Sequence, residues 1–123
     1  MDSRTKNEIS VKGDIVYLIC HGKQDQSVVH DTVTQFLELS KKIKADGLTP
    51  KCLVDLSDND GYDVEARNAA IDAMKKDAVP TAIVGTNTPL QTIVNFMTKL
   101  AGQSDKYQAF HTIEEGEKWL KSL

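Results

Sequence analysis

Apolar and polar residues follow one another along the chain in short blocks that predict strands alternating with helices. Residues 8–12 (EISVK) alternate with period two, as a half-buried strand does, and residues 15–20 (IVYLIC) are apolar throughout, as in a buried strand. Gly13-Asp14 leaves so short a connection that these two strands should pair antiparallel. Three further strands are expected, at 52–56, 81–84 and 107–110.

Between the strands, apolar residues recur at helical spacing. Helices are expected at about 26–45, 63–77 and 89–100, and as a short C-terminal segment that contains Trp119 and Leu120. Asp25 or Ser27 is expected to cap the first helix. Thr88, followed by Pro89 at the first helical position, is expected to cap the third. Residues 112–115 have the spacing of a capping box at the start of the last helix.

The order of these elements is strand, strand, helix, strand, helix, strand, helix, strand, helix, and it predicts an α/β fold. Strands that alternate with helices imply right-handed crossovers and a largely parallel sheet. We therefore expect one domain over 1–123, with a five-stranded mixed, mostly parallel sheet, helices on its faces and the first strand antiparallel at an edge. Residues 1–7 are polar and are expected to be flexible.

The composition is that of an ordinary globular domain, with 40% apolar and 27% charged residues and a net charge of −3. This net charge gives no electrostatic reason to expect binding to nucleic acid, which requires a basic stripe. The longest apolar run, 15–20, is too short to span a bilayer, so no integral membrane contact is expected. The N-terminus has no signal-peptide core, and Cys20 and Cys52 lie in apolar runs, which favours reduced thiols and a cytoplasmic location.

The polar segment after the third strand, residues 57–63, is expected to form a strand-to-helix turn, where α/β proteins often carry functional residues. It is not a calcium loop. With Gly61 at position six of an EF-hand loop, Leu56 and Arg67 would occupy positions one and twelve, where ligands are required. A phospho-aspartate site is excluded as well, because no carboxylates follow the strand at 15–20 to hold a metal.

Asp58 and Asn59 are therefore interpreted as residues that shape this turn through side-chain hydrogen bonds to the backbone. Asp60, Tyr62 and Asp63 remain candidates for binding a partner, and helix capping is the alternative for them.

A second candidate site lies at residues 85–88, between the fourth strand and its helix. Backbone N–H groups at the start of a helix can face an anion or a carbonyl, so Thr86, Asn87 and Thr88 are candidate binding residues. Simple capping by Thr88 is the alternative.

No motif in the chain carries catalytic or metal-binding chemistry. Cys20 and His21 are adjacent rather than spaced as zinc ligands, and on a strand they point to opposite faces. A pairing of Cys20 with Cys52 on a neighbouring strand stays open. Neither a nucleophile elbow nor a phosphate-binding loop is present, so no cofactor is expected and an enzyme is the least favoured hypothesis.

Four segments resemble the SpoIIAA-like, or STAS-like, family over about residues 8–122. They are HGKQD (21–25), VDLSD (54–58), AIVG (82–85) and FHTIEEGEKWL (110–120). The last is similar to the F-x-T-x-E-E-A-x-x-W-L ending common in that family, with Gly116 where alanine is usual.

This resemblance implies a regulatory, protein-binding domain. STAS domains act as switches and docking modules, and some are antagonists of anti-sigma factors in which the corresponding turn carries a D-S-S-G phosphoacceptor. Here that turn, DNDGYD (58–63), has no serine or threonine, so a kinase-controlled switch is not expected. The preferred hypothesis is a non-catalytic regulatory module that binds a protein partner.

The alternative hypothesis is a domain that binds a small apolar molecule or lipid, since SpoIIAA-like domains share their layout with CRAL-TRIO domains. It requires an apolar cavity. The strongly apolar helix at 89–100 would serve such a cavity or form a homodimer interface.

Overall fold

The computed structural model describes residues 7–123, so the expected flexibility of residues 1–7 lies outside the described residues except for Asn7. Five strands form one sheet, in the order β1-β2-β3-β4-β5. Their bounds are Glu8–Lys12, Ile15–Gln24, Lys51–Tyr62, Thr81–Val84 and Tyr107–Phe110. β1 pairs antiparallel with β2 at one edge, and the other strands are parallel. The predicted fold class is confirmed.

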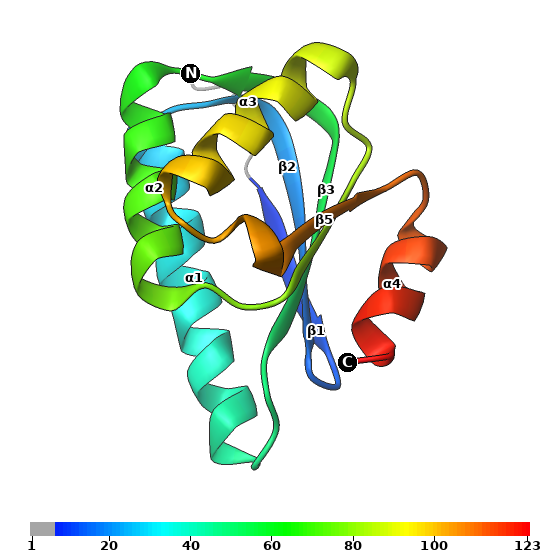
Figure 1. The fold of residues 1–123 in the computed structure, drawn as a ribbon. Coiled ribbons are helices and arrows are strands. Elements are labelled where there is room, and N and C mark those ends of the chain that lie inside the picture. Colours follow the sequence, from blue (N-terminus) through cyan, green and yellow to red (C-terminus); the bar gives the residue numbers. More distant parts are fainter. Residues whose placement is uncertain (1–6) are drawn as a thin grey trace.

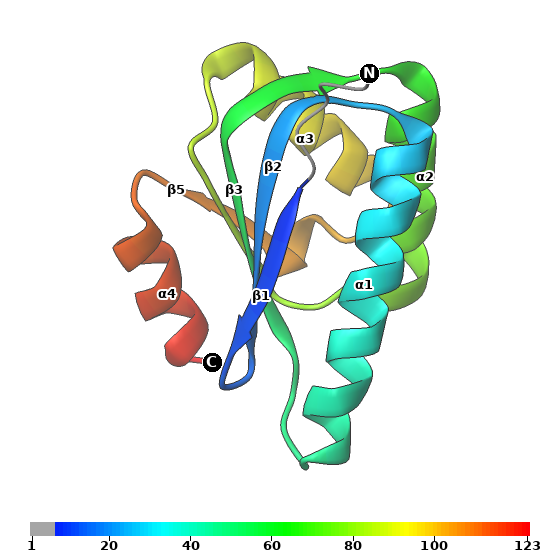
Figure 2. The ribbon, with the colours of Figure 1, turned by 180° about the vertical axis from the view of Figure 1, so that it is seen from behind.

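Four α-helices cover the two faces of the sheet unequally (Figures 1 and 2). They are α1 (Gln26–Ala45), α2 (Val64–Asp77), α3 (Thr88–Leu100) and α4 (Ile113–Lys121), and a short 3-10 turn, η1, spans Ser104–Lys106. Strands β2 to β5 are added in one direction across the sheet, and right-handed crossovers then place α1, α2 and α3 on the same face. α4 follows the last strand and covers the opposite face. No helix within residues 7–123 is long and apolar enough to cross a membrane.

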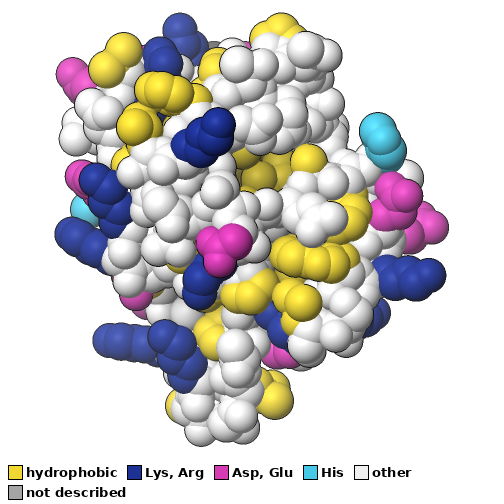
Figure 3. Space-filling view, viewed as in Figure 1, with side chains coloured by type: hydrophobic (Ala, Val, Ile, Leu, Met, Phe, Trp, Pro, Cys, Tyr) yellow, Lys and Arg dark blue, Asp and Glu magenta, His cyan; other side chains and the backbone are white. Residues whose placement is uncertain are grey.

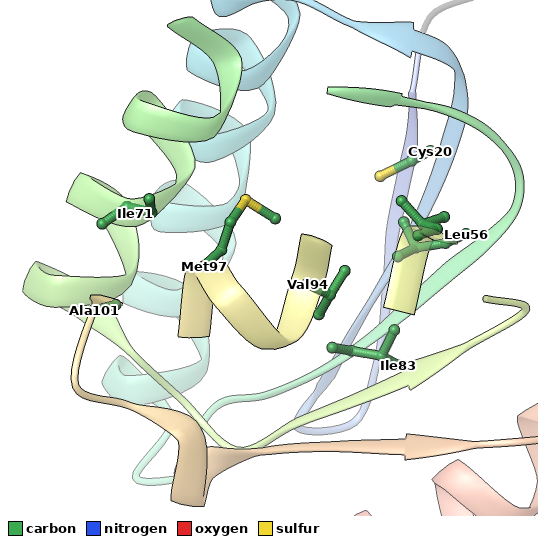
Figure 4. Packing of buried hydrophobic residues seen from close by; sticks show 8 residues of the cluster. Cys20, Leu56, Ile71, Ile83, Val94, Met97 and Ala101 are labelled. Atoms are coloured by element: carbon green, nitrogen blue, oxygen red, sulfur yellow. The ribbon is translucent and has the colours of Figure 1, made fainter. Parts of the chain in front are cut away.

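Each face of the sheet has its own core. Beneath α2 and α3, Ile71, Val94 and Met97 pack toward Cys20, Leu56 and Ile83 of the sheet (Figure 4). On the other face, α4 packs Leu120 against the sheet in the cluster formed by Ile15, Leu53, Ala82, Val84 and Leu120. A Cβ atom at Gly116 would lie 3.1 Å from the Cβ of Ala82, so glycine permits the close approach of α4.

Two strand ends differ from the prediction. β2 continues beyond Cys20 to Gln24, and β3 continues beyond Leu56 to Tyr62. The predicted turn at 57–63 is therefore wrong over 57–62, because these residues remain paired with the extension of β2. The pairing joins His21 to Asp58, Gly22 to Asn59 and Gln24 to Tyr62, with irregularities on either side of the first two pairs. Polar residues are tolerated here because the pairing supplies their backbone hydrogen bonds.

The helix caps confirm most of the predicted boundaries. Asp25 accepts a hydrogen bond from the backbone N–H of Val28 at 2.9 Å, and residues 112–115 form the predicted capping box. The prediction for α3 is wrong by one residue. Asn87, not Thr88, is its N-cap and accepts from the backbone N–H of Leu90 at 2.9 Å. An asparagine side chain is as effective an N-cap as a serine or threonine hydroxyl, so the helix begins one residue earlier than predicted.

Candidate functional site

An apolar cavity of about 160 Å³ lies between the sheet and the helices α1, α2 and α3. Its wall includes Leu18, Val54 and Ile83 from the sheet and Phe36, Met74 and Met97 from the helices. Cys20 lines it as well, and Figure 4 shows this side chain pointing from β2 toward the helices. The alternative hypothesis required such a cavity.

The groups in this cavity that could react are held in their neutral forms. Burial raises the pKa of Cys20 to about 12, although the hydroxyl of Tyr62 donates a hydrogen bond to its sulfur. Burial also raises the pKa of Cys52 to about 12 and raises the pKa of Tyr62. Thiols that stay protonated are poor nucleophiles. Both cysteines are free, so the pairing left open by the sequence is absent.

A polar network closes one end of the cavity. The amide nitrogen of Asn7 donates to Oε1 of Gln24 at 2.7 Å and to Oγ1 of Thr32 at 3.0 Å. The amide nitrogen of Gln24 donates to Oδ1 of Asn7 at 3.1 Å and to the backbone oxygen of His21 at 3.0 Å. Gln24 is only 1% exposed, and every donor of the two amides is used. This end of the cavity therefore offers a ligand no free hydrogen-bond donor.

The predicted binding residues divide between the cavity and the outside of the molecule. Tyr62 lines the cavity. Asp63 caps α2 by accepting from the backbone N–H of Ala66 at 2.8 Å. Asp60 and Thr88 are exposed, and Thr86 donates its hydroxyl to Oε1 of Gln91 at 2.7 Å.

The exposed candidates share one edge of the sheet, where the parallel strands β3 and β4 end. Gly85 lies so close to β3 that a Cβ atom on it would be 2.6 Å from the backbone nitrogen of Ser57. The extension of β3 and the loop before α3 are therefore in contact. We refer to Asp60 and residues 86–88 together as the carboxyl-edge surface.

His21 links three strands near this edge. Its Nδ1 lies 2.6 Å from Oδ2 of Asp58 in β3, and its Nε2 lies 2.5 Å from Oε2 of Glu8 in β1. The hydrogen bond to Asp58, followed by that to Glu8, raises the pKa of His21, because both carboxylates favour the charged imidazolium. No sequence pattern predicts this cluster, since it depends on how the three strands are paired. Among residues 7–123 no group of three or more His, Cys, Asp or Glu side chains is arranged to hold a metal ion.

Solved structures resemble this chain over nearly its whole length. The anti-sigma factor antagonist SpoIIAA, in its unphosphorylated form, matches with a TM-score of 0.63 and 12% identity over 95% of this chain and 99% of its own. The SpoIIAA-like architecture expected from the sequence is thereby confirmed. The chain has a SpoIIAA-like fold.

Two further solved structures show a similar match. An uncharacterized protein from Shewanella loihica, described as having a SpoIIAA-like fold, matches with a TM-score of 0.66 and 17% identity, over 98% of both chains. A variant of RsbS from Moorella thermoacetica matches with a TM-score of 0.64 and 15% identity, over 96% of this chain and 97% of its own. No family model and no curated protein sequence matches the chain. With sequence identities of 12% to 17%, these three structures establish the fold of the chain.

Proposed function

We propose that this chain is a non-catalytic regulatory domain that binds a protein partner through the carboxyl-edge surface. The observation that supports this function is the SpoIIAA-like fold, which it shares with an anti-sigma factor antagonist. The carboxyl-edge surface combines an exposed carboxylate, Asp60, with the exposed polar loop that opens α3. Ligands of open α/β sheets bind beyond the carboxyl ends of the strands, which is where this surface lies.

The chemistry of the same edge supports a role without catalysis or phosphorylation. Residues 58–63 contain no serine or threonine. The preceding residue, Ser57, donates its hydroxyl to Oδ1 of Asp55 at 2.7 Å. The two cysteines are buried and protonated, so neither is an activated nucleophile.

Reversing the charge of Asp60 should weaken partner binding at least about fivefold, because charges at an interface rim govern association and discriminate among partners. The experiment captures partners from extracts of the source cells with Asp60→Lys and quantifies them by mass spectrometry. Asp105→Lys is the matched control, since Asp105 is exposed in η1, before the amino end of β5. Equal capture of the same protein by both variants would contradict the proposed surface.

A second candidate function, the binding of a small apolar molecule, is favoured by the cavity. Its volume of about 160 Å³ is close to that of an engineered apolar cavity of about 150 Å³ that binds benzene. A compact hydrocarbon group of about six carbons therefore fits, whereas a lipid with two long chains does not.

Filling the cavity should abolish the binding of a neutral apolar probe such as hexanol. Ala73 lines the cavity from α2, so Ala73→Phe places a ring in the space that the probe would occupy. At a probe concentration of one hundred times the Kd, the original chain should gain about 2.7 kcal/mol in the free energy of unfolding, measured by urea denaturation. Asn68→Phe, on the exposed side of α2, should keep this gain. The cavity hypothesis fails when the original chain gains no stability from hexanol.

A further inference from the structure

The apolar cavity adjoins a groove between the C-terminal halves of α1 and α2. Phe36 and Leu37 of α1, Asp77 at the end of α2 and Val79 beyond it line both hollows. The groove has a volume of about 550 Å³ and is more polar than the cavity. A molecule seated in the cavity would therefore lie directly beside this groove.

The groove is rich in hydrogen-bond donors. Lys41 and Lys44 reach it from α1, and Lys76 reaches it from α2. Figure 3 shows dark blue side chains gathered over these two helices. Glu38 and Asp77 line the groove too, so one formal positive charge remains uncompensated. None of the ion pairs among residues 7–123 involves these five side chains.

One polar group of the groove is buried without a partner. The side-chain oxygen of Ser40 makes no hydrogen bond within residues 7–123, and Ser40 is only 5% exposed. A buried hydroxyl without a partner is unfavourable, and a ligand oxygen in the groove would satisfy it. The opposite end of the cavity has no such vacancy, because the amide donors of Asn7 and Gln24 are all engaged.

We propose that the chain binds a compact amphiphilic carboxylate, with a hydrocarbon end of about six carbons in the cavity and its carboxylate in the groove between α1 and α2. The inference rests on the second candidate function and adds the chemical class and the orientation of the ligand. The single excess positive charge suits one carboxylate better than a polyanion. The donors at the groove and the closed network at the other end determine which way the ligand points.

The test compares the binding of hexanoate and of hexanol to the full chain. Each compound is titrated into the protein, and binding is followed by the chemical shifts of the backbone amides. Hexanoate should bind about tenfold more tightly than hexanol, since three lysines each contribute a modest, partly screened attraction. Its affinity should fall as salt is added, and that of hexanol should not. Shifts should appear at residues of the cavity for both compounds, and at Ser40 and its neighbours for hexanoate.

Neutralising the groove should remove this preference. In the triple variant Lys41→Gln, Lys44→Gln, Lys76→Gln, hexanoate should bind no more tightly than hexanol, and the affinity for hexanol should stay within twofold. The control replaces three exposed lysines outside the groove by glutamine, at Lys106, Lys118 and Lys121, and should leave both affinities unchanged.

Two results would overturn the proposal and can be told apart. Equal affinities for hexanoate and hexanol in the original chain would remove the carboxylate and leave the apolar cavity as a binding site. Failure of both compounds to bind would remove the second candidate function itself. Ser40→Ala gives an independent measurement. This variant should bind hexanoate about threefold more weakly, and its affinity for hexanol should be unchanged.

Discussion

Replacing Gly85 with alanine is expected to lower the free energy of unfolding by about 3 kcal/mol. Gly85 has a φ of 80°, and the left-handed conformation costs other residues about 1–2 kcal/mol. The new Cβ would also lie 2.6 Å from the backbone nitrogen of Ser57 and 2.9 Å from its Cα atom. Backbone atoms cannot rotate away as a side chain does, so β3 and the loop before α3 must separate.

Urea denaturation of Gly85→Ala beside Gly47→Ala measures this contact directly. Gly47 also has a φ of 80°, but a Cβ atom there would have no neighbour within 4 Å. Gly47→Ala should therefore lose only about 1–2 kcal/mol. Equal losses of unfolding free energy in the two variants would show that the close approach of Gly85 to Ser57 does not affect stability. If partner binding uses the carboxyl-edge surface, Gly85→Ala should weaken it as well.

Replacing Leu120 with alanine is expected to lower the free energy of unfolding by about 3 kcal/mol, within the usual range for a buried leucine. Leu120 is 0% exposed, and it is the α4 residue in the core between this helix and the sheet. α4 has only nine residues, and helices of that length depend on tertiary packing. The variant should therefore release α4 before the rest of the domain unfolds.

The measurement for Leu120→Ala combines urea denaturation with the fluorescence of Trp119. Trp119 is the single tryptophan and lies on α4, with its ring 5.6 Å from that of Phe110. Its emission should report an earlier transition than far-ultraviolet circular dichroism. Leu123→Ala is the control, because Leu123 is 58% exposed, and it should change stability by less than about 0.5 kcal/mol. Coincident transitions and unchanged stability in Leu120→Ala would contradict this account of α4.

The sequence predicted the regular elements well because their signals are local. The helix expected at about 26–45 spans Gln26–Ala45, between the N-cap Asp25 and the C-cap Asp46. The strands expected at 81–84 and 107–110 have those bounds. The segment 57–62 was mispredicted because its extended conformation depends on partner residues about 37 positions earlier in the chain, whereas its own composition favours a turn.

The site was less predictable, because a cavity depends on how helices rest on a sheet. Tyr62 was a candidate on account of its place after the strand, yet its side chain lines the cavity. Gln24 and Ser40 gave no signal in the sequence, since their burial is set by neighbours distant in the chain. Val94 and Met97 of the helix predicted at 89–100 do line the cavity.

The homodimer interface expected from the same helix stays a prediction. Phe96 and Leu100 of α3 are 54% and 53% exposed. Burial of this apolar pair on a helix face would favour association.

The order of the strands has a consequence for how the chain reaches this structure. Each strand lies beside the strands that precede and follow it in the sequence, so no strand must be inserted between two that have already paired. The pairings between strands then span one strand–helix unit at a time, which limits the contact order of the sheet itself and favours faster folding. During synthesis, each new strand can join the growing edge as soon as its helix has formed. Only β5 and α4 must wait for the end of the chain.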